Sequence, residues 1–180
     1  IYVDGAELQN FEVQEIRKAV VYVSQEDFLF TASVRENLKM GNEEISDEEM
    51  IEISRKMGVH QFVSKMERAY DSVLEERGKN LSKGQRQKLS LTRAILRHPK
   101  ILILDEATSN MDSISEREIL NYIKGIRDIT LILISHRINV IADSDCIYVL
   151  QKGNIVARGT DKQLKEQCKL YRQLYGEEEK

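Results

Sequence analysis

Three short apolar runs stand out along the chain, because most of its other hydrophobic residues recur at helical spacing. The runs are 19–23 (AVVYV), 101–104 (ILIL) and 130–134 (TLILI). An apolar run of four or five residues predicts a strand that is covered on both faces, and such strands are typical of parallel sheets. We therefore predict an α/β fold in which these three runs are buried strands.

The segment 33–98 has a different pattern, with helix-start signals and amphipathic runs but no convincing strand. Ser33 and Glu36 have the spacing of a capping box, which predicts a helix start. The helices predicted here are 33–38, a helix capped by Ser46 and ending near Gly58, 60–66, and 85–97. We therefore predict a helical subdomain over 33–98, inserted into an α/β core made of residues 1–32 and 99–180.

The C-terminal part predicts an antiparallel hairpin followed by a helix. A tight turn at 152–154 (KGN) separates strands expected at 146–150 and 155–157. Asp161 is expected to cap a single terminal helix. Its apolar residues recur at helical spacing and should face the core; they are Leu164, Cys168, Tyr171 and Leu174.

Composition narrows the class of protein. The 180 residues include 27 Lys+Arg and 30 Asp+Glu, a net charge of −3, which gives no electrostatic reason to expect a nucleic-acid partner. No apolar run approaches the roughly 20 residues of a membrane-spanning helix. The two cysteines, Cys146 and Cys168, lack metal or disulfide spacing and favour a reducing compartment.

Candidate chemistry begins with Asp105 and Glu106, which directly follow the strand at 101–104. The carboxyl end of such a strand lies at the crevice where open α/β sheets bind ligands. Carboxylates beside buried aliphatic residues need a compensating cation, and Mg²⁺ held together with phosphates would supply it. The alternative is an ordinary strand that ends in a solvated acidic turn.

Two other strand ends carry polar residues. Gln25 follows the strand at 19–23, and His136 follows the strand at 130–134, at the same expected edge as Asp105. Gln25 could instead belong to a plain surface loop, and His136 could be a satisfied polar cap.

A possible anion site precedes the predicted helix 85–97. The stretch LSKGQ (81–85) places a serine and a glycine at a helix start, where backbone N–H groups lack intrahelical partners. The alternative is that Ser82 is only an N-cap.

The order of these motifs resembles that in the nucleotide-binding domain of ABC transporters, and most closely that of the exporter-like branch of the family. The motifs are, in order, a strand ending in Gln, the LSKGQ turn, ILILDEAT (101–108) and a strand ending in Ser-His. The resemblance covers essentially the whole chain and implies a P-loop NTPase-like fold that binds ATP and Mg²⁺. It implies that Asp105 and Gln25 hold the metal. It further implies that Glu106 is the catalytic base, with His136 and Gln25 as further catalytic residues.

The same resemblance implies sites for the nucleotide bound by a partner domain. LSKGQ is similar to the signature motif, so Ser82, Lys83, Gly84 and Gln85 are expected nucleotide contacts. SNMD (109–112) is similar to the D-loop, which adds Ser109 and Asp112. Residues 72–78 resemble the X-loop of exporters.

Two departures from the family pattern matter. Lys83 stands where the family usually has Gly, and we expect function to survive this change because Ser82 and Gly84 are retained. No G-x-x-x-x-G-K-[ST] loop is found in the chain, and that loop normally cradles the phosphates. Since the chain starts at Ile1 rather than Met, we expect truncation, with the central strand and phosphate loop upstream. We expect the isolated chain to be inactive.

The implied partners are a second nucleotide-binding domain, identical or different, and the transmembrane domains of a transporter. The implied location is the cytoplasmic face of the cell membrane, with no nucleic acid expected. Two alternatives stay open, an ABC-type ATPase of DNA repair or chromosome maintenance and a non-catalytic nucleotide-sensing module.

Overall fold

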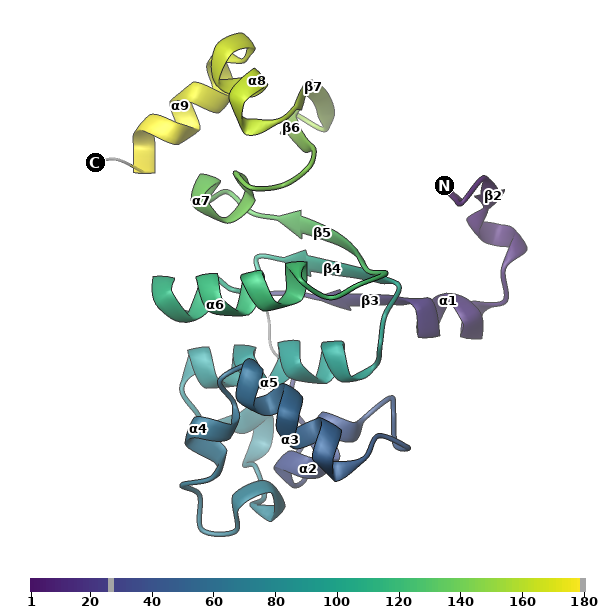
Figure 1. Ribbon diagram of the computed structural model, residues 1–180, viewed down its shortest axis with the longest axis vertical. Helices are drawn as coiled ribbons and strands as arrows, with labels where there is room; N and C mark the ends of the chain where they lie inside the picture. Colours follow the sequence, from purple (N-terminus) through teal and green to yellow (C-terminus); the bar gives the residue numbers. More distant parts are fainter. Residues whose placement is uncertain (26–27, 179–180) are drawn as a thin grey trace. The chain divides into compact units, whose positions relative to one another are not determined.

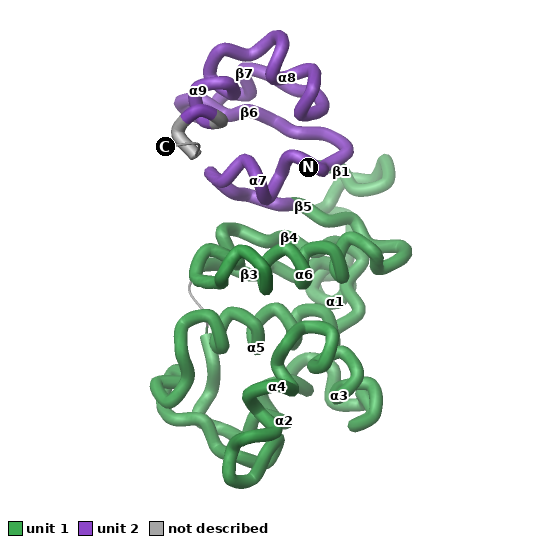
Figure 2. The backbone as a smooth tube through the Cα atoms, turned by 60° about the vertical axis from the view of Figure 1, so that its left-hand side comes forward, with its two compact units in different colours: residues 1–132 green, residues 133–180 purple. Residues whose placement is uncertain are grey.

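The computed structural model describes residues 1–25 and 28–178 and has an α/β architecture (Figure 1). The chain forms two compact units, residues 1–132 and residues 133–180 (Figure 2). The β elements are β1 (Tyr2–Val3), β2 (Ala6–Glu7), β3 (Val20–Val23), β4 (Ile101–Asp105), β5 (Thr130–Ile134), β6 (Ile147–Gln151) and β7 (Asn154–Gly159). The α-helices are α1 (Val13–Ala19), α2 (Val34–Lys39), α3 (Asp47–Lys56), α4 (His60–Val63), α5 (Lys83–Leu96), α6 (Ser113–Lys124), α7 (Ile138–Ile141), α8 (Asp161–Gln167) and α9 (Lys169–Glu178). Three short 3₁₀ helices are η1 (Leu8–Asn10), η2 (Ala69–Asp71) and η3 (Glu76–Gly78).

The three apolar runs form one sheet with strand order β3-β4-β5. β3 and β4 are parallel, as predicted, and their register pairs Val20 with Ile101 and Val23 with Leu104. Leu102 and Leu104 are 0% and 2% exposed, so this face of β4 belongs to the core.

The prediction that all three strands are covered on both faces is wrong, because Tyr22 of β3 is 57% exposed and β5 is open on one face. Ile132 is 44% exposed and Ile134 is 48% exposed, whereas Leu131 and Leu133 are partly covered. The apolar run correctly predicts a strand. Whether each face of that strand is buried depends on which other parts of the fold pack against it. Within the described residues, one face of β5 lacks that cover.

Residues 33–98 are helical, and α5 lies between β3 and the helices α2 and α3 (Figure 1). The predicted capping box is present, because the Ser33 hydroxyl accepts from the Glu36 N–H and the Glu36 carboxylate accepts from the Ser33 N–H. Two predicted boundaries need correction. The helix at 60–66 ends at Val63, and the long helix begins at Lys83 rather than Gln85, because Ser82 caps it.

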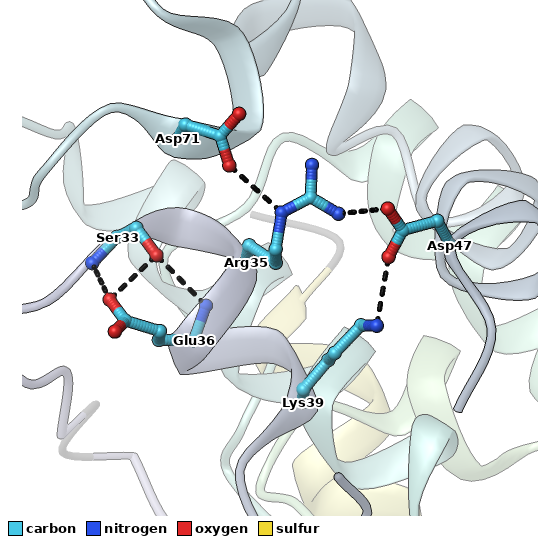
Figure 3. A network of polar contacts seen from close by, with 6 residues as sticks. All are labelled: Ser33, Arg35, Glu36, Lys39, Asp47 and Asp71. Carbon is cyan, nitrogen blue, oxygen red and sulfur yellow. Dashed lines mark hydrogen bonds and ion pairs between the residues drawn. The ribbon is translucent and has the colours of Figure 1, made fainter. Parts of the chain in front are cut away.

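A charged network joins α2, α3 and η2 (Figure 3). Arg35 donates from Nε to Asp71 at 2.8 Å, and its guanidinium also forms an ion pair with Asp47. Lys39 adds a second ion pair to Asp47, at 2.8 Å. Arg35 therefore fixes the start of the segment 72–78 against two helices.

The second unit contains the predicted hairpin, β6 paired antiparallel with β7. Thr160, not Asp161, is the N-cap of α8, since its hydroxyl accepts from the Gln163 N–H while Asp161 is the first helical residue. The predicted single terminal helix is two helices, because Cys168 leaves helical geometry with φ −114° and ψ 108°. As predicted, Leu164, Cys168 and Tyr171 are buried in a core to which Leu174 adds partly buried surface.

Candidate functional site

The ends of β3 and β4 open into a cavity of about 240 Å³ lined by Ser24, Gln25, Asp105 and Glu106. Because the strands are parallel and Val23 pairs with Leu104, the residues that follow each strand emerge side by side. The structure therefore brings together three of the predicted site residues, Gln25, Asp105 and Glu106. Ser24 lines the cavity as well and was not predicted.

Asp105 accepts a hydrogen bond of 2.8 Å from the hydroxyl group of Tyr22. Tyr22 pairs in register with Ile103, two residues before Asp105, so both side chains lie on the same face of the sheet. The hydrogen bond to Asp105 raises the pKa of Tyr22 above its usual value. Tyr22 could not be predicted from the sequence, since the register that brings it beside a residue 83 positions away has no local sequence signal.

Glu106 occupies the left-handed region of backbone space, with φ +50°. This conformation is uncommon for a residue other than glycine and is often found where function requires it. The chain reverses there, and the Ser109 N–H donates to the Glu106 carbonyl at 3.1 Å. β4 therefore ends at Asp105, and Glu106 begins the turn that leads toward α6.

The segment 109–112 ends at the start of α6. Asp112 is the N-cap of this helix and accepts from the Ser115 N–H at 2.9 Å. That backbone hydrogen bond is the main reason why the pKa of Asp112 is lowered. Ser109 lies 3.5 Å from Gln87 of α5, so the segment contacts the helix that carries the LSKGQ turn.

The LSKGQ turn forms the start of α5. Ser82 and Gln85 make a reciprocal capping box, with the Ser82 N–H donating to Gln85 Oε1 at 2.9 Å and the Gln85 N–H donating to Ser82 Oγ at 3.2 Å. Ser82 is thus an N-cap, as the alternative to an anion site predicted. Lys83 is exposed in the first turn. The start of a fourteen-residue helix also concentrates N–H groups suited to an anion.

The four residues of this turn, Ser82, Lys83, Gly84 and Gln85, are not among those that line the described cavity. His136 belongs to the second unit, where it lies between β5 and α7 with its side chain exposed. The predicted site residues therefore fall into a cavity group, an α5 group with 109–112, and His136.

The cavity suits a hard cation bound together with phosphates. Within the described residues, no group of three or more His, Cys, Asp or Glu side chains could hold a metal by itself. Mg²⁺ characteristically uses only one or two carboxylates and takes its other ligands from phosphates and water. The oxygen atoms of Asp105, Gln25 and Ser24 fit that role. Among the same residues, no helix has the length and hydrophobicity to cross a bilayer.

A family model described as "ABC transporter" matches residues 1–109. The chain belongs to the ABC transporter family. It is 42% identical over 168 residues to the heterocyst differentiation ATP-binding protein HepA of Nostoc, covering 93% of this chain and 28% of that protein. It is 38% identical to the putative export ATP-binding/permease protein RC1073 of Rickettsia conorii, covering 99% of this chain and 31% of that protein.

A solved structure agrees with this assignment. A bacterial Atm1-family ABC exporter with ATP bound superposes with a TM-score of 0.93 and 29% sequence identity, over 98% of this chain and 31% of that chain. The predicted fold class and the predicted family, including its exporter-like branch, are confirmed. The chain spans about a third or less of the relatives that it matches, so the activity of a whole protein belongs to the proposal below.

Proposed function

We propose that this chain is the larger part of a nucleotide-binding domain that binds and hydrolyses ATP to power export through transmembrane domains. The cavity at the ends of β3 and β4 carries the proposal, because it unites Gln25, Asp105 and Glu106 in one place. Residues 33–98 would form its helical subdomain. The remainder would belong to the α/β core.

Each cavity residue has a distinct role in this proposal. Asp105 and Gln25 would hold Mg²⁺, which supplies neutralisation of phosphate charge when it is bound. Glu106 would accept a proton from the water whose oxygen attacks the γ-phosphorus as the bond to the β–γ bridging oxygen breaks. His136 would stabilise the charge that develops on the γ-phosphate.

A second domain, identical or different, would complete the site. The backbone N–H groups at the start of α5, together with Ser82, Lys83, Gly84 and Gln85, would close over the nucleotide held by the partner. Ser109 and Asp112 would lie at the same interface. ATP binding would then favour the closed dimer, and hydrolysis would release it.

The surface for the membrane partner would include Phe28 and Phe30, which are 55% and 39% exposed around the buried Leu29. Their rings meet edge to face with centroids 4.7 Å apart. The segment 72–78 contacts the chain just after Phe30, since the Leu74 N–H donates to the Ala32 carbonyl at 2.9 Å. The domain would bind its membrane partner through this surface, and we place it at the cytoplasmic face of the membrane.

The test replaces the proposed base. In the full-length protein, Glu106→Gln should retain ATP binding and lower ATP turnover by roughly 10² or more, as for loss of a general base. Glu118→Gln, which changes an exposed carboxylate on α6, is the matched control and should leave turnover unchanged. Equal turnover in the wild type and Glu106→Gln would refute the assignment. The isolated 180-residue chain, with no phosphate loop, should show no ATPase activity, and steady hydrolysis by it would refute that part.

A further inference from the structure

Gln87 is a polar residue in an unusual position, because its side chain is 0% exposed in the second turn of α5. Both ends of its amide contact the segment 109–112. Its Oε1 accepts from the Asn110 N–H at 3.0 Å, and its Nε2 donates to Ser109 Oγ at 3.5 Å. A buried amide costs free energy unless it is hydrogen-bonded, and here its partners both come from one short segment.

Neighbouring residues on the same face of α5 contact the same stretch. A Cβ atom placed on Gly84, one turn before Gln87, would lie 3.1 Å from the Asn110 carbonyl oxygen, so the backbone of Asn110 rests directly on the helix. Lys88 donates to Ser115 Oγ at 2.9 Å, just after the segment ends. The first two turns of α5 thus form a surface on which 109–115 is laid.

We propose that Gln87 is a positioning residue, which holds the segment 109–112 against the helix that begins with LSKGQ. The segments 81–85 and 109–112, both expected at the dimer interface, would then keep a fixed position relative to each other within each domain. The Ser109 N–H also donates to the Glu106 carbonyl, so the same contact restrains the turn that carries the proposed base. This inference rests on the proposed function, and Gln87 itself touches no reacting atom.

The test compares three variants in the full-length protein. Gln87→Met keeps the length of the side chain and removes both hydrogen bonds. It should lower the kcat for ATP by about 10- to 100-fold, as for misplaced reacting groups, with the KM for ATP within about twofold of the wild type. Gln87→Glu keeps an acceptor for the Asn110 N–H, and its kcat should be at least about threefold higher than that of Gln87→Met.

The matched control is Thr92→Val. Thr92 is equally buried on α5, and its hydroxyl donates to the Lys88 carbonyl of the same helix at 2.7 Å rather than to 109–112. This variant should lower the thermal midpoint while kcat stays unchanged. If Thr92→Val and Gln87→Met lower kcat to the same extent, the role of Gln87 is only structural, and the inference is overturned.

A second measurement does not depend on activity. Amide hydrogen exchange across 106–112 should be at least about tenfold faster in Gln87→Met than in the wild type, with exchange across the rest of α5 unchanged. Unaltered exchange there would overturn the inference. A wild-type protein that hydrolyses ATP while Gln87→Met is unaffected overturns this inference alone. A wild-type protein without ATPase activity overturns the proposed function, and the exchange rates then decide whether Gln87 holds the segment.

Discussion

The hydroxyl of Tyr22 and the carboxylate of Asp105 are joined by a 2.8 Å hydrogen bond between neighbouring parallel strands. Asp105 is one of the two residues proposed to hold Mg²⁺, and Tyr22 donates a hydrogen bond to its carboxylate. Groups that hydrogen-bond a metal-binding carboxylate fix its rotamer and tune its affinity for the metal. Tyr22 would therefore belong to the proposed metal site, although it does not line the cavity itself.

Tyr22→Phe should weaken the use of Mg²⁺ by the full-length protein. The substitution removes only the hydroxyl, so the Asp105 carboxylate loses its donor while the ring is retained. We expect the Mg²⁺ concentration for half-maximal ATPase activity to rise about tenfold, the lower end of the range for such partners. A magnesium titration at saturating ATP measures this.

Tyr148→Phe is the control for the hydroxyl group. Tyr148 is also exposed on a strand, β6. Its ring centroid lies 5.7 Å from Cζ of Arg158. This variant should leave the magnesium requirement unchanged. A Tyr22→Phe protein with the wild-type requirement would show that the hydrogen bond has no part in metal binding.

Lys83 can be tested by one replacement that reverses its charge and one that removes it. Lys83 is an exposed cation in the first turn of α5, where the helix dipole favours a negative charge. Lys83→Glu should therefore stabilise the domain by about 0.3–1 kcal/mol in denaturant titrations. It should nevertheless raise the KM for ATP, because the new charge would face the phosphates of the partner's nucleotide.

Lys83→Gly restores the residue usual in the family and should keep kcat within about threefold of the wild type, at a cost of up to about 1 kcal/mol in helix stability. If Lys83→Glu left the KM unchanged, the expected contact between this turn and the nucleotide would be excluded.

The helix starts at Ser33 and near Ser82 can be read from the sequence because capping is decided within four residues. Because the capping rules use only these few residues, they also give one wrong prediction, that Asp161 is an N-cap. Thr160 and Asp161 can both cap a helix, and only the backbone conformation, with ψ 164° at Thr160, separates the cap from the first helical residue. Local rules therefore place helix starts to within a residue or two.

Properties that depend on distant residues were not predictable. The run at 130–134 predicts β5 correctly, but the exposure of Ile132 depends on what packs on the sheet. Tyr22 and Gln87 look like ordinary strand and helix residues in the sequence. Their contacts with Asp105 and Asn110 exist only because the fold sets the register of two strands and the packing of α5.

The ion pairs of Asp47 should make the stability of the helical segment depend on acid pH. Lys39, followed by Arg35, lowers the pKa of Asp47 below its usual value of 3.8. A lowered pKa in the folded state stabilises the protein fully above pH 3.8, and this contribution is lost as the pH falls through the lowered value. Asp47→Asn should therefore lower the urea midpoint near neutral pH and show a smaller further loss below about pH 4 than the wild type.

Asp145→Asn, which changes an exposed carboxylate of the second unit, is the control and should leave this pH dependence unchanged. Parallel pH profiles for the wild type and Asp47→Asn would show that the ion pairs of Asp47 in Figure 3 do not contribute to the pH dependence of stability.

Gly78 should be intolerant of any side chain. It has φ +65°, a conformation that costs a non-glycine residue about 1 kcal/mol, and an added Cβ would lie 2.9 Å from Leu29 Cδ1 and 3.2 Å from Arg86 Cδ. Leu29 is buried and cannot move aside without opening the core. Gly78→Ala should therefore destabilise the first unit by about 2–4 kcal/mol, the sum of the backbone cost and overpacking.

Gly5→Ala isolates the backbone part of that cost within the same unit. Gly5 has φ +82°, and a Cβ added there would have no heavy atom within 4 Å. This variant should lose only about 1 kcal/mol in urea titrations followed by circular dichroism. An equal loss of unfolding free energy in Gly5→Ala and Gly78→Ala would mean that the Leu29 side chain moves to accommodate the added methyl group. The segment 72–78 would then be less tightly packed against Leu29 than the distances indicate.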